Sequence, residues 1–169
     1  DDIIVKSKNH TLKGSHLLVA AGRKANIGKD LGLDNANIAH TPKGIQVNDR
    51  LQTSNKNIYV IGDCIGDLQF THVAGYHAGI VIRNILFKLP AKANNTATPW
   101  VTYCDPELAH VGLTNAHALE QFPNAITLRF PFKENDRAIA EHATKGLIKV
   151  TTKKNGVVLG ASIVGKSAG

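Results

Sequence analysis

Residues 57–63 read Asn-Ile-Tyr-Val-Ile-Gly-Asp, and this stretch decides the fold of the chain around it. Its run of β-branched and aromatic residues predicts a short buried strand, and the Gly62-Asp63 pair predicts a turn at the end of that strand. Open α/β folds bind ligands beyond the carboxyl ends of their strands. We therefore expect the Asp63 carboxylate to accept hydrogen bonds from a sugar or polyol hydroxyl; the alternative is an ordinary aspartate in a strand–helix loop.

The clearest helix of the sequence follows, between Thr71 and Lys88. Apolar residues recur there near helical spacing, Thr71 is expected to cap the start, and Pro90 ends the pattern. The first amides of a helix are unpaired and carry the positive end of its dipole, so they suit an electron-rich carbonyl or an anionic ring. Strand, turn and helix start together form the candidate ligand site.

The segments before this site predict small elements, most of them strands. We expect a hairpin or paired edge strands from residues 1–7 and 9–14, and a continuous apolar strand over residues 16–21 that stops at Gly22-Arg23. A short helical turn is expected within residues 28–35, and a brief strand over residues 45–47.

The segments after the helix follow a different pattern. Residues 90–99 are small, polar and bounded by prolines, which is typical of an interdomain linker. A short helix is then expected over residues 114–121 with Thr114 as its N-cap. Asn155-Gly156 between two β-branched runs predicts a hairpin. Strands are expected over residues 100–104, 108–113, 125–132, 146–152 and 157–164.

Composition narrows the class of protein. The 169 residues are 43% hydrophobic and 20% charged, the balance of a globular protein with a core, and no apolar run is long enough for a membrane-spanning helix. The formal net charge is +7, but the basic residues are scattered, which favours solvated lysines over a nucleic-acid interface. Methionine is absent and the chain opens with Asp1-Asp2, so we expect a piece of a longer protein.

Three other sequence features could indicate a functional site, but the residues around them argue against it. Residues 160–167 fit the P-loop pattern, but a β-branched strand runs through them and no helix that could complete a phosphate cradle is expected after them. Cys64 and Cys104 form no close pair, so two unpaired structural cysteines are expected rather than a redox dithiol. His72 and His77 are five residues apart, a spacing unsuited to chelation from one helix face, and no metal site is expected.

Taken in order, the segments of this chain resemble the pyridine nucleotide–disulfide oxidoreductases, the flavoprotein family of dihydrolipoamide dehydrogenase, glutathione reductase and mercuric reductase. The matching segments are residues 16–23 (His-Leu-Leu-Val-Ala-Ala-Gly-Arg), 31–33, 44–47, 51–54, 57–64, 70–74 (Phe-Thr-His-Val-Ala), 105–109 (Asp-Pro-Glu-Leu-Ala), 111–114, 135–138 (Asn-Asp-Arg-Ala), 146–150 and 159–165. Each is weak alone, and their shared order makes the resemblance specific. Residues 135–138 look most like the mercuric-reductase branch.

The resemblance implies a fold of the α/β and α+β classes. A partial three-layer FAD-binding domain would be followed by a truncated dimerisation domain with an antiparallel sheet. Residues 1–22 would end the nicotinamide-nucleotide domain, residues 23–97 would form the returning part of the FAD-binding domain, and residues 98–169 would begin the dimerisation domain.

The resemblance also implies eight cofactor-binding residues. They are Gly22 and Arg23 at the turn beside the flavin and nicotinamide sites, Gly62 and Asp63 at the ribityl chain, and Thr71, His72, Val73 and Ala74 at the pyrimidine edge of the isoalloxazine. Ala25 stands where the family usually has proline, a minor change in loop stiffness. No catalytic residue is expected, because the redox cysteine pair and the His and Glu acid–base groups would lie outside this chain.

The implied parent is a cytoplasmic homodimer that takes part in cell redox homeostasis. It would pass electrons from NAD(P)H through FAD to a redox disulfide and then to a small-molecule or disulfide acceptor, with no nucleic-acid or membrane partner. The alternative describes the isolated chain as a non-catalytic flavin-domain and dimerisation module. We expect the isolated chain to be inactive, and the resemblance leaves open whether it binds FAD or NAD(P)H.

Overall fold

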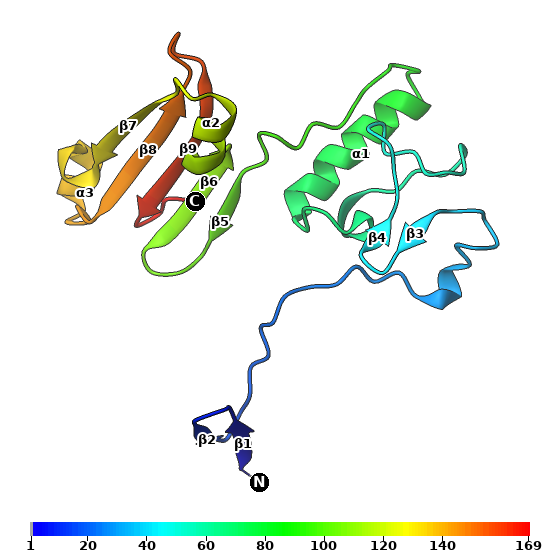
Figure 1. Ribbon diagram of the computed structural model, residues 1–169, viewed down its shortest axis with the longest axis horizontal. Coiled ribbons are helices and arrows are strands. Elements are labelled where there is room, and N and C mark those ends of the chain that lie inside the picture. Colours follow the sequence, from blue (N-terminus) through cyan, green and yellow to red (C-terminus); the bar gives the residue numbers. More distant parts are fainter. Residues whose placement is uncertain (1) are drawn as a thin grey trace. The chain divides into compact units, whose positions relative to one another are not determined.

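The computed structural model describes residues 2–169 and divides them into two compact units, one ending at Ala91 and one beginning at Lys92 (Figure 1). Asp1, the first residue of the expected hairpin and of the expected 1–22 domain, lies outside the described residues. The division falls inside the proline-bounded segment 90–99. The boundaries of the three expected domains stay predictions.

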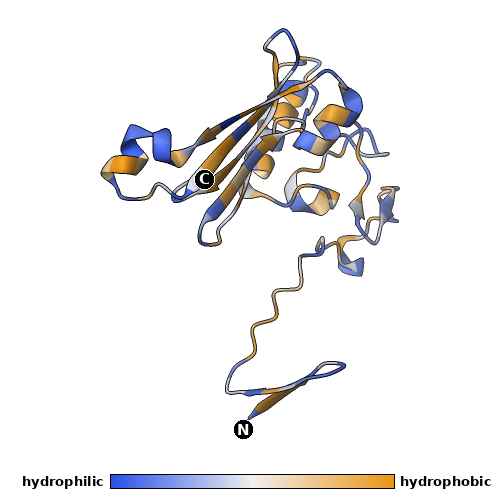
Figure 2. Cartoon of the chain, turned by 60° about the vertical axis from the view of Figure 1, so that its left-hand side comes forward, coloured by the Kyte–Doolittle hydropathy of each residue, from blue (hydrophilic) through white to orange (hydrophobic). Residues whose placement is uncertain are grey.

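The first unit begins with the expected hairpin, in which β1 (Ile3–Lys6) pairs antiparallel with β2 (Thr11–Gly14). The strand expected over residues 16–21 is wrong. Leu18 and Val19 are 88% and 75% exposed, and this extended segment is largely hydrophobic in Figure 2. An apolar run becomes a strand only when a neighbouring strand pairs with its backbone, and no described residue does so here.

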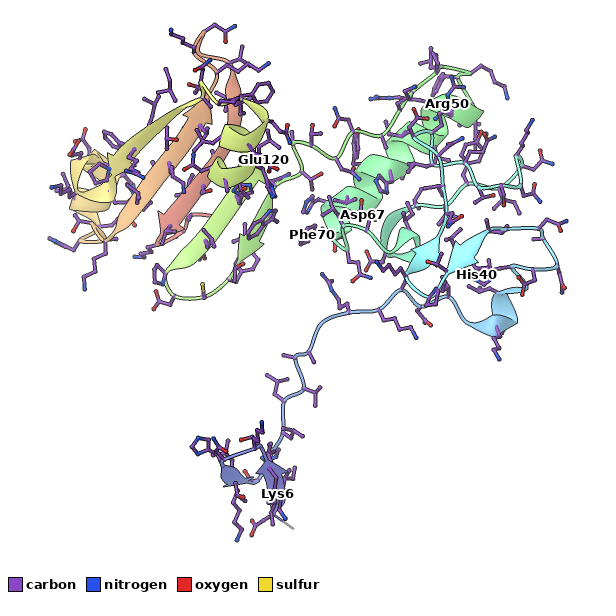
Figure 3. The ribbon with its side chains drawn as sticks, in the orientation of Figure 1. Lys6, His40, Arg50, Asp67, Phe70 and Glu120 are labelled. Atoms are coloured by element: carbon purple, nitrogen blue, oxygen red, sulfur yellow. The ribbon has the colours of Figure 1, made fainter. Side chains whose placement is uncertain are left out.

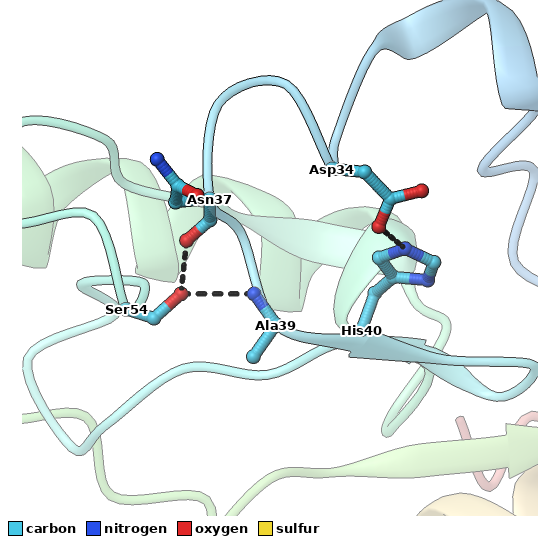
Figure 4. A network of polar contacts seen from close by, with 5 residues as sticks. All are labelled: Asp34, Asn37, Ala39, His40 and Ser54. Carbon is cyan, nitrogen blue, oxygen red and sulfur yellow. Dashed lines mark hydrogen bonds and ion pairs between the residues drawn. The ribbon is translucent and has the colours of Figure 1, made fainter.

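The middle of the first unit is held by polar contacts rather than by long elements. The expected helical turn is the 3-10 helix η1 (Lys29–Leu31), and β3 (His40–Thr41) pairs with β4 (Gly44–Ile45) in place of a strand over 45–47. The Ser54 hydroxyl accepts from the Ala39 N–H and donates to the Asn37 carbonyl, both at 2.8 Å (Figure 4).

The stretch 57–63 does not form the buried strand expected of it. It makes one isolated antiparallel bridge, between Gln52 and Tyr59, and Ile61 is exposed. Within residues 2–169 no parallel neighbour pairs with it, so its apolar run remains half-buried. The turn expected at its end is present as the 3-10 helix η2 (Gly62–Ile65).

The principal helix of the first unit is α1 (Thr71–Ile85), which buries Val73, His77 and Ile80. It ends earlier than the expected Lys88, because the chain leaves the helix after Leu86 and Lys88 adopts a left-handed φ of 54°. The Leu89 N–H then donates to the Arg83 carbonyl at 3.0 Å, which closes the last turn two residues before Ala91.

The second unit is a five-stranded antiparallel sheet, which confirms the expected α/β and α+β class with an antiparallel sheet in the second half. The strands are β5 (Trp100–Thr102), β6 (Glu107–Gly112), β7 (Ile126–Pro131), β8 (Gly146–Thr152) and β9 (Val158–Gly165), in the order β5-β6-β9-β8-β7. Three short helices connect them, namely α2 (Asn115–Gln121), η3 (Phe132–Glu134) and α3 (Asp136–Ala140).

The helix α2 is fixed by the cap that the sequence predicts. The Thr114 hydroxyl accepts from the His117 N–H at 3.3 Å, and the side-chain amide of Asn115 donates to the Thr127 hydroxyl at 2.8 Å. The first bond satisfies a free amide of the helix and the second ties its first turn to β7. Ala118, fully buried, completes this contact.

The predicted hairpin at Asn155-Gly156 joins β8 to β9. The Gly156 N–H donates to the Lys153 carbonyl at 2.9 Å, and the Lys153 N–H donates to the Val157 carbonyl at 2.7 Å. Gly156 has a φ of 87° while Asn155 stays at negative φ. The loop is thus a type I turn followed by a left-handed glycine rather than a two-residue Asn-Gly turn.

Replacing Gly156 tests this turn. Gly156→Ala should lower the free energy of unfolding of the second unit by about 1–2 kcal/mol, because a Cβ atom disfavours the left-handed conformation. No atom lies within 4 Å of the added Cβ, so the effect is conformational. Gly156→Asn should cost less, because asparagine tolerates this region. Urea unfolding followed by the fluorescence of Trp100, the single tryptophan, measures both; equal stability of the two variants would contradict the assigned turn.

Candidate functional site

The turn at Gly62 is pressed against the start of α1. Gly62 is buried with a φ of 66°, and a Cβ atom added to it would lie 2.9 Å from the Cβ atom of Ala74. Its N–H donates to Nδ1 of His77 at 3.2 Å. A glycine is therefore required here both by the backbone conformation and by the distance to the helix.

The same turn is closed on its other side by the β3–β4 hairpin. The Gly66 N–H donates to the Asp63 carbonyl at 3.0 Å, and Gly66 has a φ of 79°. A Cβ atom on Gly66 would collide with the carbonyl of Lys43, and one on Gly44 would collide with the carbonyl of Ile65. The backbone around Asp63 is thus held between a hairpin and a helix.

The Asp63 side chain projects to the surface from this fixed backbone. It is exposed, and it makes no hydrogen bond or ion pair with any described residue. A carboxylate accepts up to four hydrogen bonds and donates none. Asp63 is therefore an unused acceptor at a defined position.

The N-terminus of α1 lies beside this turn and has no side-chain cap. The N-cap is Phe70, so the expected cap by Thr71 is wrong: Thr71 is already the first helical residue. The Phe70 carbonyl accepts from the amides of Val73 and Ala74, at 3.0 and 3.2 Å. Among the described residues the amides of Thr71 and His72 find no partner, and they remain available as donors.

Aromatic and basic groups surround the helix start. The rings of Phe70 and His72 stack with their centroids 5.3 Å apart, and Figure 3 labels Phe70 and Asp67 beside the beginning of α1. The Arg23 guanidinium donates to the Gln69 carbonyl. Arg23 is thereby brought to the loop before α1 across 46 residues of sequence, whereas Gly22, with a φ of 101°, stays open.

The sequence pattern argues against His77 as a metal ligand and predicts no partner for it. In the structure its Nδ1 atom accepts a hydrogen bond from the Gly62 amide. The available signal was a histidine among apolar residues at a core position, which requires a polar partner inside the fold.

The P-loop spelling does not form a phosphate-binding loop in the structure. Its residues 160–165 lie on β9, which remains a strand to Gly165. Cys64 and Cys104 are both free; Cys64 is half-buried and Cys104 is exposed. In the described part of the chain, no helix is long and apolar enough to span a membrane.

Comparison with known proteins identifies the family. The profile of the pyridine nucleotide-disulphide oxidoreductases matches residues 1–78, and that of the pyridine nucleotide-disulphide oxidoreductase dimerisation domain matches residues 98–169. The chain belongs to the pyridine nucleotide-disulphide oxidoreductase family. The family that the ordered segments resemble is thereby confirmed.

Individual relatives agree. A dihydrolipoyl dehydrogenase of Bacillus subtilis is 37% identical over 97% of the chain, which is 35% of that protein. A mercuric reductase of Staphylococcus aureus is 36% identical over 99% of the chain and 31% of that protein. The HOCl-induced flavoprotein disulfide reductase RclA of Escherichia coli matches with a TM-score of 0.87 and 28% identity, over 99% of the chain and 39% of its own. The chain spans about a third of the length of these relatives.

Substituting Gly62 tests the packing of the turn. Gly62→Ala should destabilise the first unit by about 2 kcal/mol or more, since the added methyl meets Ala74 and the φ is left-handed. Gly75→Ala is the matched control, because that glycine lies within α1 with open space around it and should stabilise by about 0.5–1 kcal/mol. Thermal unfolding followed by circular dichroism at the helix band should lower the midpoint for the first and raise it for the second; a shift of both in one direction would refute the close contact.

Proposed function

We propose that residues 1–169 are the flavin-binding and dimerisation part of an FAD-dependent oxidoreductase. The complete oxidoreductase would transfer electrons from NAD(P)H through FAD to a redox disulfide, and from there to a small-molecule or disulfide acceptor. The observation that carries the proposal is the Gly62-Asp63 turn fixed against the uncapped start of α1, in a chain whose two halves match two domains of one family.

The free polar groups of the site fit the parts of a flavin. The exposed Asp63 carboxylate would accept hydrogen bonds from the hydroxyls of the ribityl chain. The free amides of Thr71 and His72 would donate to the carbonyl oxygen and ring nitrogen of the pyrimidine edge, where the helix dipole adds a favourable field. Gly62, Val73 and Ala74 would form the backbone frame of the site, because Gly62 lacks a side chain and so packs directly against Ala74. When bound, FAD supplies hydride acceptance and electron transfer.

Arg23 and Gly22 would lie at the edge of the proposed site, near the loop before α1. Arg23 already reaches the Gln69 carbonyl beside the helix start, and Gly22 provides a backbone free of side chain on the same turn. In this proposal they border the place where flavin and nicotinamide meet. The chain holds no closely spaced cysteine pair, so the role of residues 1–169 is to bind and to assemble, and the isolated chain would be a non-catalytic module.

The proposal includes a homodimer and a cytoplasmic place in cell redox homeostasis. Support for the dimer comes from the dimerisation profile over residues 98–169 and from the apolar face of the sheet. The strand register places one set of side chains on that face, namely Leu128, Phe130, Ile148, Val150, Ala161 and Ile163. Leu128 is 56% exposed, and hydrophobic segments run along the strands in Figure 2.

Asp63→Ala tests the flavin assignment. In the complete protein the dissociation constant for FAD should rise by about one to two powers of ten, because each charge-assisted bond contributes about 1.5–3 kcal/mol and about 1.4 kcal/mol is tenfold. Titration of the apoprotein with FAD, followed by flavin fluorescence, gives the constant. Asp67→Ala is the control, an exposed carboxylate in the same loop that should change FAD binding little. Equal FAD affinity of the two variants would remove Asp63 from the site.

Leu128→Lys tests association through the sheet. The isolated chain should self-associate, because exposed apolar surface of this kind is normally covered. A lysine on β7, the edge strand of the apolar face, should lower the associated fraction, while Arg129→Gln, one residue on and on the opposite face, should not. Light scattering at increasing concentration reports the mass; a monomeric unsubstituted chain at all concentrations would argue against this face as an interface.

A further inference from the structure

The side chain of His77 is buried, and only one of its two ring nitrogens makes a hydrogen bond within residues 2–169. It is 2% exposed, and its Nδ1 atom accepts the N–H of Gly62 at 3.2 Å. Because a backbone amide can only donate, Nδ1 carries no proton, and the neutral ring carries its proton on Nε2. That Nε2 atom is buried and has no hydrogen-bond partner among the described residues.

A purely apolar residue would fill this position of α1 at lower cost. Burying an unpartnered N–H costs free energy, and Val73 and Ile80 occupy the same buried face without that penalty. What the histidine alone provides is an acceptor, fifteen residues along the chain, for the buried amide of Gly62. Without it, that amide would be buried and unpaired at the point where the turn meets the helix.

We propose that His77 is a positioning residue for the flavin site: its Nδ1 atom ties the Gly62 amide to α1 and so fixes Asp63 relative to the amides of Thr71 and His72. This inference rests on the proposed function. His77 touches none of the groups offered to the flavin; it acts through the backbone of Gly62. One helix then carries both halves of the site, the donor amides at its start and, six residues after Thr71, the anchor of the acceptor turn.

The ordinary role of a buried histidine is packing, and the two roles predict different outcomes for different substitutions. His77→Leu keeps an apolar side chain of similar bulk and removes the acceptor. His77→Asn loses volume, but its Oδ1 atom takes the place of Nδ1 as acceptor. Packing therefore favours leucine, whereas the positioning role favours asparagine. Ile80→Val, one helical turn further on the buried face, is the control for a mild loss of packing alone.

The experiment measures two quantities on the complete protein for each variant. The first is the dissociation constant for FAD, by titration of the apoprotein. The second is the hydrogen-exchange rate of the Gly62 amide without cofactor, resolved by nuclear magnetic resonance. For His77→Leu we expect FAD binding weakened about tenfold and Gly62 exchange accelerated about tenfold, which corresponds to about 1.4 kcal/mol. For His77→Asn and Ile80→Val both quantities should stay within about threefold of the unsubstituted protein.

The outcomes separate this inference from the function on which it rests. Rescue of both quantities by asparagine but not by leucine supports the positioning role. Equal loss in the leucine and asparagine variants, or FAD binding by His77→Leu as tight as that of the unsubstituted protein, overturns it. If His77→Leu fails to fold, unprotected Gly62 exchange in the folded His77→Asn variant overturns it as well. Failure of the unsubstituted apoprotein to bind FAD overturns the proposed function itself.

Discussion

The contact between the Gly62 backbone and α1 is the constraint on which the first unit depends. A side chain at that position is unfavourable, because its Cβ atom would lie 2.9 Å from that of Ala74, and the buried amide there is paired with the acceptor that His77 supplies. The hairpin β3–β4 then closes on the same turn through Gly44 and Gly66. Because Gly44, Gly62 and Gly66 have no side chains, the hairpin, the turn and the helix can approach one another closely. This close packing fixes the conformation of the loops around the turn.

The site shows a division between buried backbone and exposed polar groups. The parts that set its geometry are satisfied inside the fold, as in the bond from Gly62 to His77. The parts that stay without partners among residues 2–169, the Asp63 carboxylate and the amides of Thr71 and His72, lie at the surface or at a helix end. A fixed frame with free donors and acceptors loses little entropy when a ligand binds, which is the physical content of preorganisation.

Elements that depend on neighbours close in sequence could be predicted from the sequence alone. The cap at Thr114, the β8–β9 hairpin and the body of α1 all follow from local periodicity and turn chemistry. The strands predicted over residues 16–21 and 57–63 are absent from the structure. A strand requires a partner strand, and the apolar pattern of a segment does not show whether it has one. Local sequence patterns group the Gly62-Asp63 turn with the helix start, and the resemblance adds Gly22 and Arg23 to the predicted site. The contact of His77 with Gly62 is not predicted, because two segments that approach each other across fifteen residues leave no periodic pattern.

The strand order of the second unit has a consequence for its folding during synthesis. β9 is the last strand of the sheet in the chain, yet it lies at the centre and pairs with β6 on one side and β8 on the other. The residue pair His110 and Ser162 joins these strands across 52 residues. During synthesis, β5 and β6 therefore leave the ribosome before the strand that joins them to β7 and β8 exists. Until β9 has been made, the strand pairs β5–β6 and β7–β8 keep unpaired edges, and such edges are open to pairing with another chain.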